Sequence, residues 1–270
     1  MKGFLPLLIA LVVPVGVCAD VFRPGPNQQL QLGERAAADL RKREKVLPAS
    51  DARVRLVRRV GQRLKKVFSD PGKPWKFTFD VIDSKQVNAF SLPGGPSFIY
   101  TGLLSKLKTE DELAGIMGHE ITHVRREHWA YAYAEGQKRQ LGLTLALILL
   151  RANRTVGDVA GISNDLVFNL PYSRRHETEA DEGGLKMMVS AGYNPEGMVD
   201  AFKMLAKEAG AGHPPEFLSD HPSDASRVKH MQEIIAGMDR DFPSQRPLEV
   251  KAAVEPEDFL AYRLEYYGLR

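Results

Sequence analysis

The sequence predicts an α+β fold that is mostly helical and contains one small antiparallel sheet. Several segments repeat apolar residues at helical spacing, whereas only a few short segments alternate in the manner of strands. A composition of 43% hydrophobic and 26% charged residues is ordinary for a globular protein that buries a core. The length of 270 residues leaves room for one good-sized domain or two small ones.

Residues 1–19 have the pattern of a cleavable secretory signal. A positively charged start precedes an apolar run over residues 4–17, and Val17 and Ala19 occupy the small-residue positions before a cleavage site. Acylation of Cys18 as a lipoprotein is the alternative, but Val17 stands where such a signal usually has Gly, Ala or Ser. We therefore expect a soluble periplasmic protein rather than one anchored through Cys18. Because Cys18 is the only cysteine, any metal must be held by histidine and carboxylate.

Two helices are predicted before the sheet. An extended leader is followed by a helix that Pro48 ends, and Asp51, with Ser50, is suited to cap a second helix that runs to about residue 68. The chain then divides into a signal peptide at 1–19, a leader and helix at 20–49, a main domain at 50–240 and a C-terminal tail at 241–270.

Three short segments are predicted to form the sheet. Residues 75–82 alternate apolar and polar side chains and make the best strand in the sequence. Residues 88–90 and 97–101 flank the turn Leu92-Pro93-Gly94-Gly95-Pro96. The prolines and glycines beside the later strand are typical of a sheet edge, so we place that strand at the edge.

A capping box formed by Thr109 and Glu112 predicts the start of a central helix, which we expect to run past His128. The region 130–169 contains an apolar stretch at residues 141–150 that is too short to span a bilayer. This stretch suits either a buried core helix or a mobile helix beside a functional site or a membrane surface. We favour the core helix.

Three further helices complete the domain. Ser173 is placed to cap the first of them, and Pro195 stands at the tolerated first position of the next. The last helix is predicted over residues 223–238.

A formal charge of +3 is too small to indicate nucleic acid as a partner.

The stretch His119-Glu120-Ile121-Thr122-His123 carries the chemistry. Two histidines four residues apart on a helix face the same way, so both imidazoles can bind one metal ion. This is the H-E-x-x-H arrangement of zinc hydrolases, in which the glutamate takes a proton from water instead of binding the metal. The same letters also occur by chance on solvated helix faces, so the other ligands decide between the two interpretations.

A catalytic zinc ion needs a third protein ligand and one open position. Glu177 is the candidate ligand, and Asp181, one turn further on, could accept the N–H of a ligand histidine. The alternative is an exposed acidic helix start. His221, six residues before Arg227, could donate to an oxyanion or fill the open position in a resting state, and a surface histidine is the alternative. The remaining histidines are expected to be structural or solvated, namely His128, His176, His213 and His230.

These segments, in this order, resemble the HtpX/BepA-type zinc metallopeptidases, a family that includes the CAAX prenyl and mitochondrial Oma-type endopeptidases. The resemblance covers roughly residues 28–238. Besides the residues above, it is carried by Val60-Gly61-Gln62-Arg63-Leu64 and by Asn88-Ala89-Phe90-Ser91-Leu92-Pro93-Gly94-Gly95. Neither the membrane-spanning helices of HtpX-like members nor the tetratricopeptide repeats of BepA-like members are found here, so we do not expect roles that depend on them.

The resemblance implies a zincin (gluzincin) fold with one zinc ion per chain. It implies that His119, His123 and Glu177 bind this ion, that Glu120 is the general base and that Asp181 orients a ligand. His221 and Arg227 match residues at the active-site cleft of family members.

The resemblance also implies that a polypeptide substrate adds as a strand to the sheet edge. With the edge placed as above, the strand that receives it would be Pro96, Ser97, Phe98, Ile99 and Tyr100.

The sequence therefore predicts a periplasmic zinc metalloendopeptidase of envelope protein quality control, in which Glu120 activates a zinc-bound water to hydrolyse unfolded or misassembled proteins. One alternative is a periplasmic chaperone or assembly factor that binds extended peptide in the same cleft with little hydrolysis. Another is a domain that the metal only stabilises. Peripheral membrane association is compatible with the sequence, and oligomeric state has no signal in it.

Overall fold

The computed structural model describes residues 22–149, 172–210, 215–221 and 225–249. The predicted signal peptide with Cys18, the region 150–171, His213 and the aromatic part of the tail lie outside these residues. The described helices are α1 (Pro26–Arg43), α2 (Ala52–Lys65), α3 (Thr101–Leu104), α4 (Glu110–Arg125), α5 (His128–Leu149), α7 (Arg174–Ser190), α8 (Glu196–Gly210), α9 (Glu216–Asp220) and α10 (Ala225–Ala236). The strands are β1 (Thr78–Ile82), β2 (Ala89–Ser91) and β3 (Pro96–Tyr100), so the mostly helical α+β prediction is confirmed.

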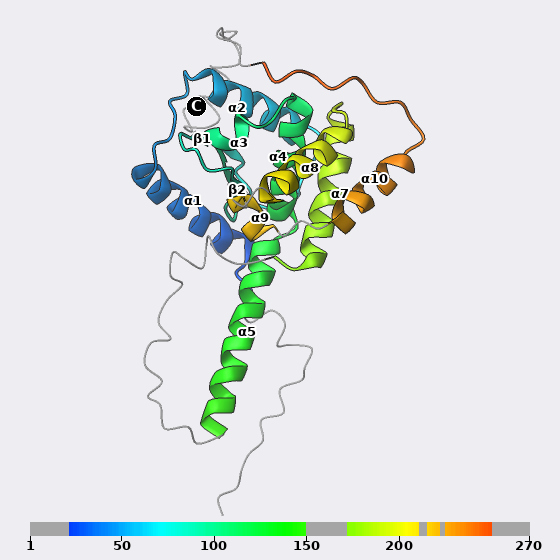
Figure 1. Ribbon diagram of the computed structural model, residues 1–270. Coiled ribbons are helices and arrows are strands. Elements are labelled where there is room, and N and C mark those ends of the chain that lie inside the picture. Colours follow the sequence, from blue (N-terminus) through cyan, green and yellow to red (C-terminus); the bar gives the residue numbers. More distant parts are fainter. Residues whose placement is uncertain (1–21, 150–171, 211–214, 222–224, 250–270) are drawn as a thin grey trace, which may run out of the picture.

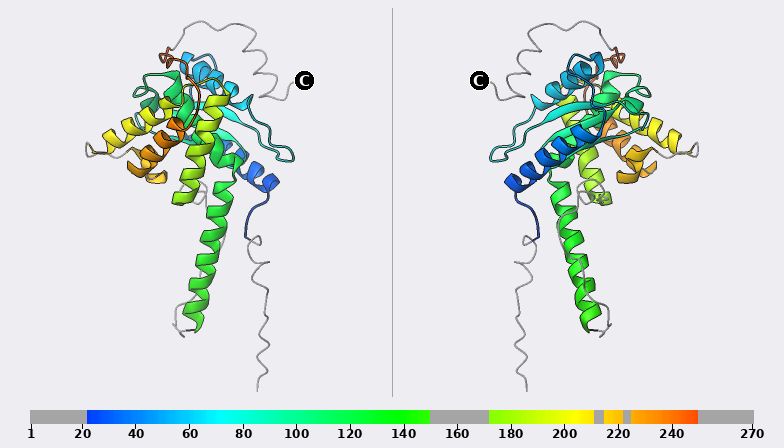
Figure 2. Two further views of the ribbon diagram at one scale, coloured as in Figure 1. Left: turned by 90° about the vertical axis from the view of Figure 1, so that its right-hand side faces the viewer. Right: turned by 90° about the vertical axis from the view of Figure 1, so that its left-hand side faces the viewer.

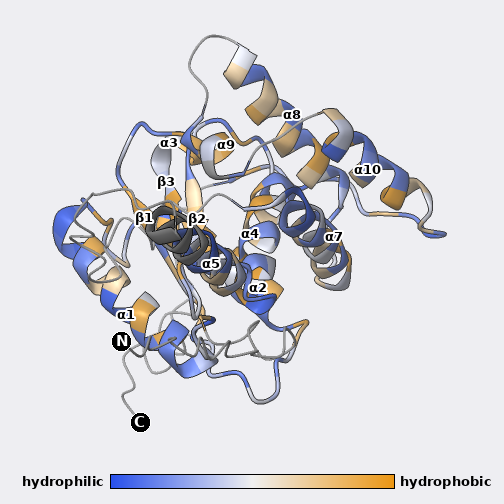
Figure 3. Ribbon diagram, turned by 90° about the horizontal axis from the view of Figure 1, so that it is seen from below, coloured by the Kyte–Doolittle hydropathy of each residue, from blue (hydrophilic) through white to orange (hydrophobic). Residues whose placement is uncertain are grey.

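The elements form layers around α4, which runs through the middle of the domain (Figure 1). The sheet lies with α1 and α2 on one side of α4, and α7, α8 and α10 lie on the other (Figures 1 and 3). Successive residues of β3 point to opposite faces of the sheet: Phe98 packs in a small cluster with α1, and Ile99 packs in the main core with α2 and α4. Both faces of the sheet are therefore covered.

The sheet is mixed, and β3 is its central strand. The strand order is β1-β3-β2, with β1 parallel and β2 antiparallel to β3. The prediction of an antiparallel sheet with its edge at Pro96–Tyr100 is wrong on both points. Gly94 and Gly95, which have positive φ angles of 86° and 124°, form the turn between β2 and β3. The prolines and glycines thus mark a hairpin turn, and all five residues of β3 are buried.

The helix α4 begins as predicted but ends earlier. The Thr109 hydroxyl accepts a hydrogen bond from the Glu112 N–H at 3.0 Å, and the Glu112 carboxylate accepts one from the Thr109 N–H at 3.2 Å. The helix stops at Arg125, because Glu127 adopts a left-handed conformation with φ of 58°. A new helix, α5, starts at His128.

The chain after α10 returns to the start of α4. The backbone N–H of Arg246 donates to the buried Asp111 carboxylate at 2.7 Å, and Thr109 forms a bridge with Pro247. Asp111 also accepts from the N–H of Asn194 at 2.6 Å. One buried carboxylate therefore fixes the N-terminus of α4 against two distant segments.

The helix α5 extends away from the domain. Trp129 and Ala134, near its start, are buried, but its later part lies beyond the other described elements (Figures 1 and 2). Residues 141–149, for which a core helix was predicted, form this later part of α5. Within the described ranges, no helix combines the length and apolar character needed to cross a membrane.

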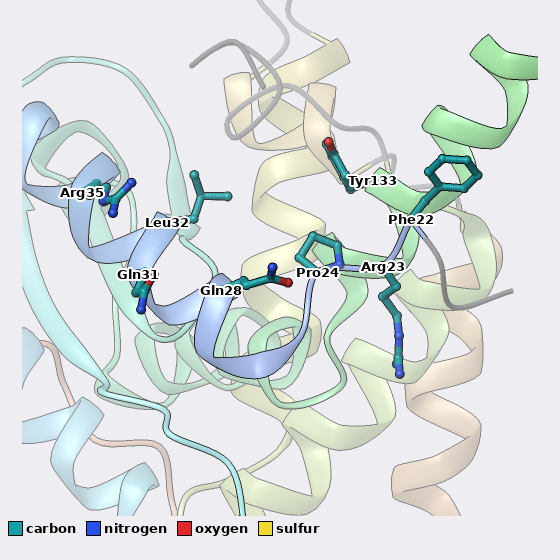
Figure 4. A pocket seen from close by; sticks show the side chains of 8 residues that line it. All are labelled: Phe22, Arg23, Pro24, Gln28, Gln31, Leu32, Arg35 and Tyr133. Carbon is teal, nitrogen blue, oxygen red and sulfur yellow. The ribbon is translucent and has the colours of Figure 1, made fainter. Parts of the chain in front are cut away.

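A hollow of about 380 Å³ lies between the start of α1 and the base of α5. Arg23, Arg35 and Tyr133 are among the residues that line it (Figure 4). Arg23 donates to the Tyr131 hydroxyl at 2.8 Å, which connects the two segments. None of the seven predicted site residues lines this hollow.

Glycines allow α4 to approach its neighbours closely. A Cβ atom on Gly184 of α7 would lie 3.0 Å from the backbone nitrogen of His119, and one on Gly183 would lie 2.4 Å from the Thr122 side chain. On the other side, a Cβ on Gly115 would lie 2.6 Å from the Met198 Cα of α8. Gly183 and Gly184 thus let α7 approach α4 more closely than residues with a Cβ atom would.

We predict that Gly115→Ala destabilises the protein by about 1–3 kcal/mol, because the added methyl group meets backbone that cannot move aside. Gly136→Ala is the matched control, since a Cβ at Gly136 on α5 meets nothing within 4 Å. The control is expected to be neutral or up to about 1 kcal/mol more stable. Urea unfolding measures both, and equal effects of the two substitutions would contradict the packing argument.

Candidate active site

Four side chains from three helical elements converge inside the domain. His119 and His123 belong to α4, Glu177 to the first turn of α7, and His221 follows the last residue of α9. Each offers one ligand atom, and these four atoms lie within 4.8 Å of one another. All four residues are buried, with exposed fractions of 2% or less. The structure thus brings together residues that the sequence separates by about a hundred positions.

The ligand atoms have the separations of a four-coordinate metal site. His119 Nε2 lies 3.0 Å from His123 Nε2 and 3.1 Å from His221 Nδ1. Glu177 Oε1 lies 3.1 Å from His221 Nδ1 and 3.4 Å from His123 Nε2. Tetrahedral coordination at zinc–ligand distances of about 2.0–2.1 Å separates the ligand atoms by about 3.3 Å. The residues therefore fit a metal ion of that size.

The charges of the cluster favour a cation. Burial opposes ionisation of Glu177, but His221 and His119 hold the pKa of this carboxyl far below its usual range. Burial and the neighbouring His119 lower the pKa of His123 well below its ordinary value, so its imidazole is neutral, as a metal ligand must be. The pKa of His119 is raised in spite of its burial, because Asp181 and Glu177 accept its hydrogen bonds. The cluster therefore attracts positive charge.

Asp181 lies where it can orient His119. Its Oδ1 is 3.0 Å from His119 Nδ1, on the side of the ring opposite the ligand cluster. A carboxylate in this position accepts the N–H of a metal-binding imidazole and fixes its tautomer. Burial opposes ionisation of Asp181, but hydrogen bonds with His119 and Arg227 lower its pKa. The structure thus shows the predicted contact between Asp181 and one of the two motif histidines.

Arg227 binds both carboxylates of α7. It donates from Nε and Nη2 to Asp181 at 2.8 and 2.7 Å, and its Nη1 lies 2.8 Å from Glu177 Oε2. Its guanidinium also lies 4.9 Å from the ring centre of Phe202 on α8. Arg227 is thus in the site as predicted, and it holds Glu177 and Asp181 in place through direct ion pairs.

Glu120 lies beside the ligand cluster but is not one of its four members. Its Oε1 is 3.3 Å from His221 Nε2, and only 2% of the residue is exposed. Glu120 follows His119 directly on α4, so its side chain points to a different side of the helix from the two histidines. The arrangement leaves a carboxylate within reach of a reacting water or carbonyl group at the cluster.

Two residues close to the cluster were not identified from the sequence. His128 Nδ1 lies 3.0 Å from His123 Nδ1, and the Tyr172 ring centre lies 4.1 Å from that of His123. Burial, with the neighbouring His176, lowers the pKa of His128 to about 4, so it is neutral at neutral pH. The turn between α4 and α5 creates the first contact, which the spacing of the histidines does not predict.

Fold and candidate site together have the form of a metallopeptidase domain. The family model described as Peptidase family M48 matches residues 51–235, and the chain belongs to this family. The resemblance to the HtpX/BepA- and Oma-type peptidases is thereby confirmed.

Named relatives come from both mitochondria and bacteria. The mitochondrial metalloendopeptidase OMA1 of Arabidopsis thaliana is 35% identical over 149 residues, which are 55% of this chain and 30% of that protein. OMA1 of Schizosaccharomyces pombe is 31% identical over 70% of this chain and 55% of its own length. The beta-barrel assembly-enhancing protease of Escherichia coli is 29% identical over 72% of this chain and 39% of its own length. The chain thus spans from under a third to about half of these relatives.

We predict that Arg227→Ala lowers the free energy of unfolding by about 3 kcal/mol, because it leaves two buried carboxylates without their cationic partner. Lys229→Ala, on the same helix, is the control. Lys229 is 3.7 Å from Glu233, and the two side chains are 78% and 61% exposed, so its loss is expected to cost less than about 1 kcal/mol. Chemical denaturation measures both, and similar effects would contradict the role of the buried ion pairs.

Proposed function

We propose that this protein is a zinc-dependent endopeptidase in which Glu120 is the general base. The observation that carries the proposal is the buried group His119, His123, Glu177 and His221 with the Glu120 carboxylate at its side. Histidine and carboxylate are the ligands of catalytic zinc sites that contain no cysteine.

The bound zinc ion would polarise the substrate carbonyl and make water a stronger nucleophile at neutral pH. His119, His123 and Glu177 would hold it. Glu120 would take the proton of the attacking water and pass it to the leaving amine, as a buried carboxylate within hydrogen-bond distance can do. Asp181 and Arg227 keep the ligands oriented throughout.

We propose two roles for His221, one in the resting site and one when a substrate is bound. Its Nδ1 faces the other three ligand atoms, which supports a resting state in which His221 is the fourth ligand. Its Nε2 faces Glu120, so the same ring would also restrain the general base. Release of His221 would open one position for substrate and leave its N–H available to an oxyanion. Such an arrangement favours low activity until a substrate enters.

The substrate that we propose is an extended polypeptide, bound along the outer edge of β2. In the described part of the chain, the strand order places β2 at the edge of the sheet, and β2 packs on α4. The bonds from Leu92 N–H to Pro96 and from Tyr100 N–H to Asn88 turn alternate residues of β2 toward β3. Ala89 and Ser91 therefore direct their backbone groups away from β3. The Ala89 N–H donates to Asn88 Oδ1 at 2.8 Å, so we propose that a peptide pairs with the Ala89 carbonyl and with the backbone of Ser91.

This edge lies beside the candidate metal site. The N–H of Phe217, in α9, lies 3.4 Å from the Val87 carbonyl just before β2. The Phe217 ring stacks on His221 with centres 4.6 Å apart. A peptide along β2 would thus pass close to His221 and Glu120.

We predict that cleavage depends on substrate backbone N–H groups. N-methylation of alternate residues in a cleavable peptide should raise KM at least tenfold at the positions that pair with β2, because each methyl group removes a strand hydrogen bond. Methylation of the intervening residues is the control, since their N–H groups point away from β2. Equal effects at both sets of positions would contradict binding by strand addition.

The cellular role that we propose is envelope protein quality control. The support is the secretory pattern of residues 1–19 and the similarity to a protein named beta-barrel assembly-enhancing protease.

We predict that protein isolated from cells begins at Asp20, which N-terminal sequencing can show. An acylated Cys18 as first residue would instead support the lipoprotein alternative, and an intact Met1 would contradict secretion by either route.

Two other functions use the same residues differently. A periplasmic chaperone or assembly factor would bind peptide along β2 with little hydrolysis, and a permanently bound His221 would favour this. A domain that the metal merely stabilises would unfold when the metal is removed by a chelator. The catalytic proposal expects lost activity with the fold retained.

Glu120→Gln separates these possibilities. We predict that it lowers the cleavage rate of an unfolded protein such as casein by about 10²–10⁴-fold, because the amide cannot accept the proton from water. The zinc content and the unfolding temperature should be unchanged, since Glu120 is not among the ligands.

Glu182→Gln is the matched control. Glu182 is on α7, 3.1 Å from His230, and does not contact the ligand cluster. This substitution should leave the cleavage rate within about twofold of wild type. If Glu120→Gln retained full activity, the endopeptidase proposal would be wrong and peptide binding alone would become the function.

A further inference from the structure

The two histidines of α4 have different partners on the sides of their rings that face away from the ligand cluster. His119 Nδ1 lies 3.0 Å from the carboxylate of Asp181. His123 Nδ1 lies 3.0 Å from a second imidazole nitrogen, Nδ1 of His128. A metal-binding imidazole needs an acceptor at this position, so His128 takes for His123 the place that a carboxylate takes for His119.

The proton positions in this contact follow from the ligand cluster. His123 Nε2 faces His119 Nε2 at 3.0 Å, so a metal-binding His123 carries its proton on Nδ1. That N–H points at His128 Nδ1, which therefore accepts the hydrogen bond. The proton of His128 is then on Nε2, which lies 3.3 Å from Glu179 Oε2.

Glu179 ends this chain of hydrogen bonds at the protein surface. Its other oxygen accepts from Arg175 Nε at 2.8 Å, and 35% of its side chain is exposed. The three groups His123, His128 and Glu179 thus alternate donor and acceptor from the buried ligand to the surface carboxylate. For His123 and for His128, only one tautomer satisfies the contacts of both ring nitrogens.

A strained turn places His128 in this position. Glu127, just before it, has a left-handed φ of 58°, which is unfavourable for a residue with a Cβ. Its buried carboxylate accepts from Gln29 Nε2 of α1 at 2.7 Å and forms an ion pair with Lys73. The His128 ring also stacks on His176 at 4.5 Å with an angle of 13° between planes. The backbone turn and the stacked ring together fix the direction of His128.

We propose that His128 is a positioning residue for the metal ligand His123 and that Glu179 anchors it. The inference rests on the proposed function in one respect, namely that His123 binds the metal. His128 keeps the His123 ring in the tautomer and orientation that direct its Nε2 to the ligand cluster. Loss of this acceptor weakens metal binding even though His128 never touches the metal.

The experiment compares His128→Leu with His128→Asn, two side chains of similar size. The Asn oxygen lies near the place of His128 Nδ1 and can accept the His123 N–H, whereas Leu cannot. We expect zinc affinity, measured by competition with a chelator, to fall about 10–100-fold in His128→Leu and to recover most of that loss in His128→Asn. Cobalt substitution gives a second readout, because its visible spectrum changes when a ligand ring is displaced.

Two control variants give the lower and upper limits of the expected loss of zinc affinity. His230→Leu removes a histidine that pairs with Glu182 away from the cluster, and it should bind zinc as wild type does. Glu177→Ala removes a proposed ligand and should lose more affinity than His128→Leu. Unfolding of the metal-free proteins is measured in parallel, because a purely structural role would lower stability in both His128 variants and leave the zinc affinity of the folded protein unchanged.

Wild-type zinc affinity in folded His128→Leu would overturn the proposal, and so would equal losses in the Leu and Asn variants. If His128→Leu does not fold, Glu179→Ala decides: a several-fold loss of zinc affinity supports the proposal and an unchanged affinity overturns it. Because the readout is metal affinity, a wild-type protein that binds zinc but cleaves no peptide would refute the endopeptidase function and leave this inference standing.

Discussion

The close contact between α4 and α7 is the constraint on which the site depends. Gly184 lies so near the backbone of His119 that a methyl group there would come within 3.0 Å of its nitrogen. Glu177 and Asp181 are one turn apart on α7. This approach lets them reach the two ring nitrogens of His119, Glu177 at Nε2 and Asp181 at Nδ1. A larger side chain at Gly184 would push α7 outward and move Glu177 away from His119.

Burying several charged groups together is costly unless each has partners, and the arrangement here supplies them collectively. Arg227 contacts both carboxylates of α7, and each carboxylate contacts an imidazole. Removing any member leaves the others buried without full compensation, so the group acts as a unit. A bound cation would complete this balance within the hydrophobic core.

The sequence predicted the site better than the sheet. Helical spacing and the capping box located α4 and its two histidines, and Glu177, Asp181, His221 and Arg227 were expected near them because their motifs occur in the family's order. The structure places all of these residues in one cluster. The sheet was predicted with the wrong edge, since proline and glycine mark a turn without stating which strand lies beside which. The end of α4 was also missed, because nothing in the local sequence shows that Glu127 is held in a left-handed conformation by Gln29 and Lys73.

By itself, the sequence determined the chemical groups and their local directions: the spacing of His119 and His123 puts both rings on one face of a helix whatever surrounds it. Only the tertiary structure decided which groups lie on the other side of each ring. Asp181 reaches His119 across a helix contact, and His128 reaches His123 across a turn. Those contacts join different elements, so they depend on packing and backbone conformation over the whole domain, which no local pattern encodes.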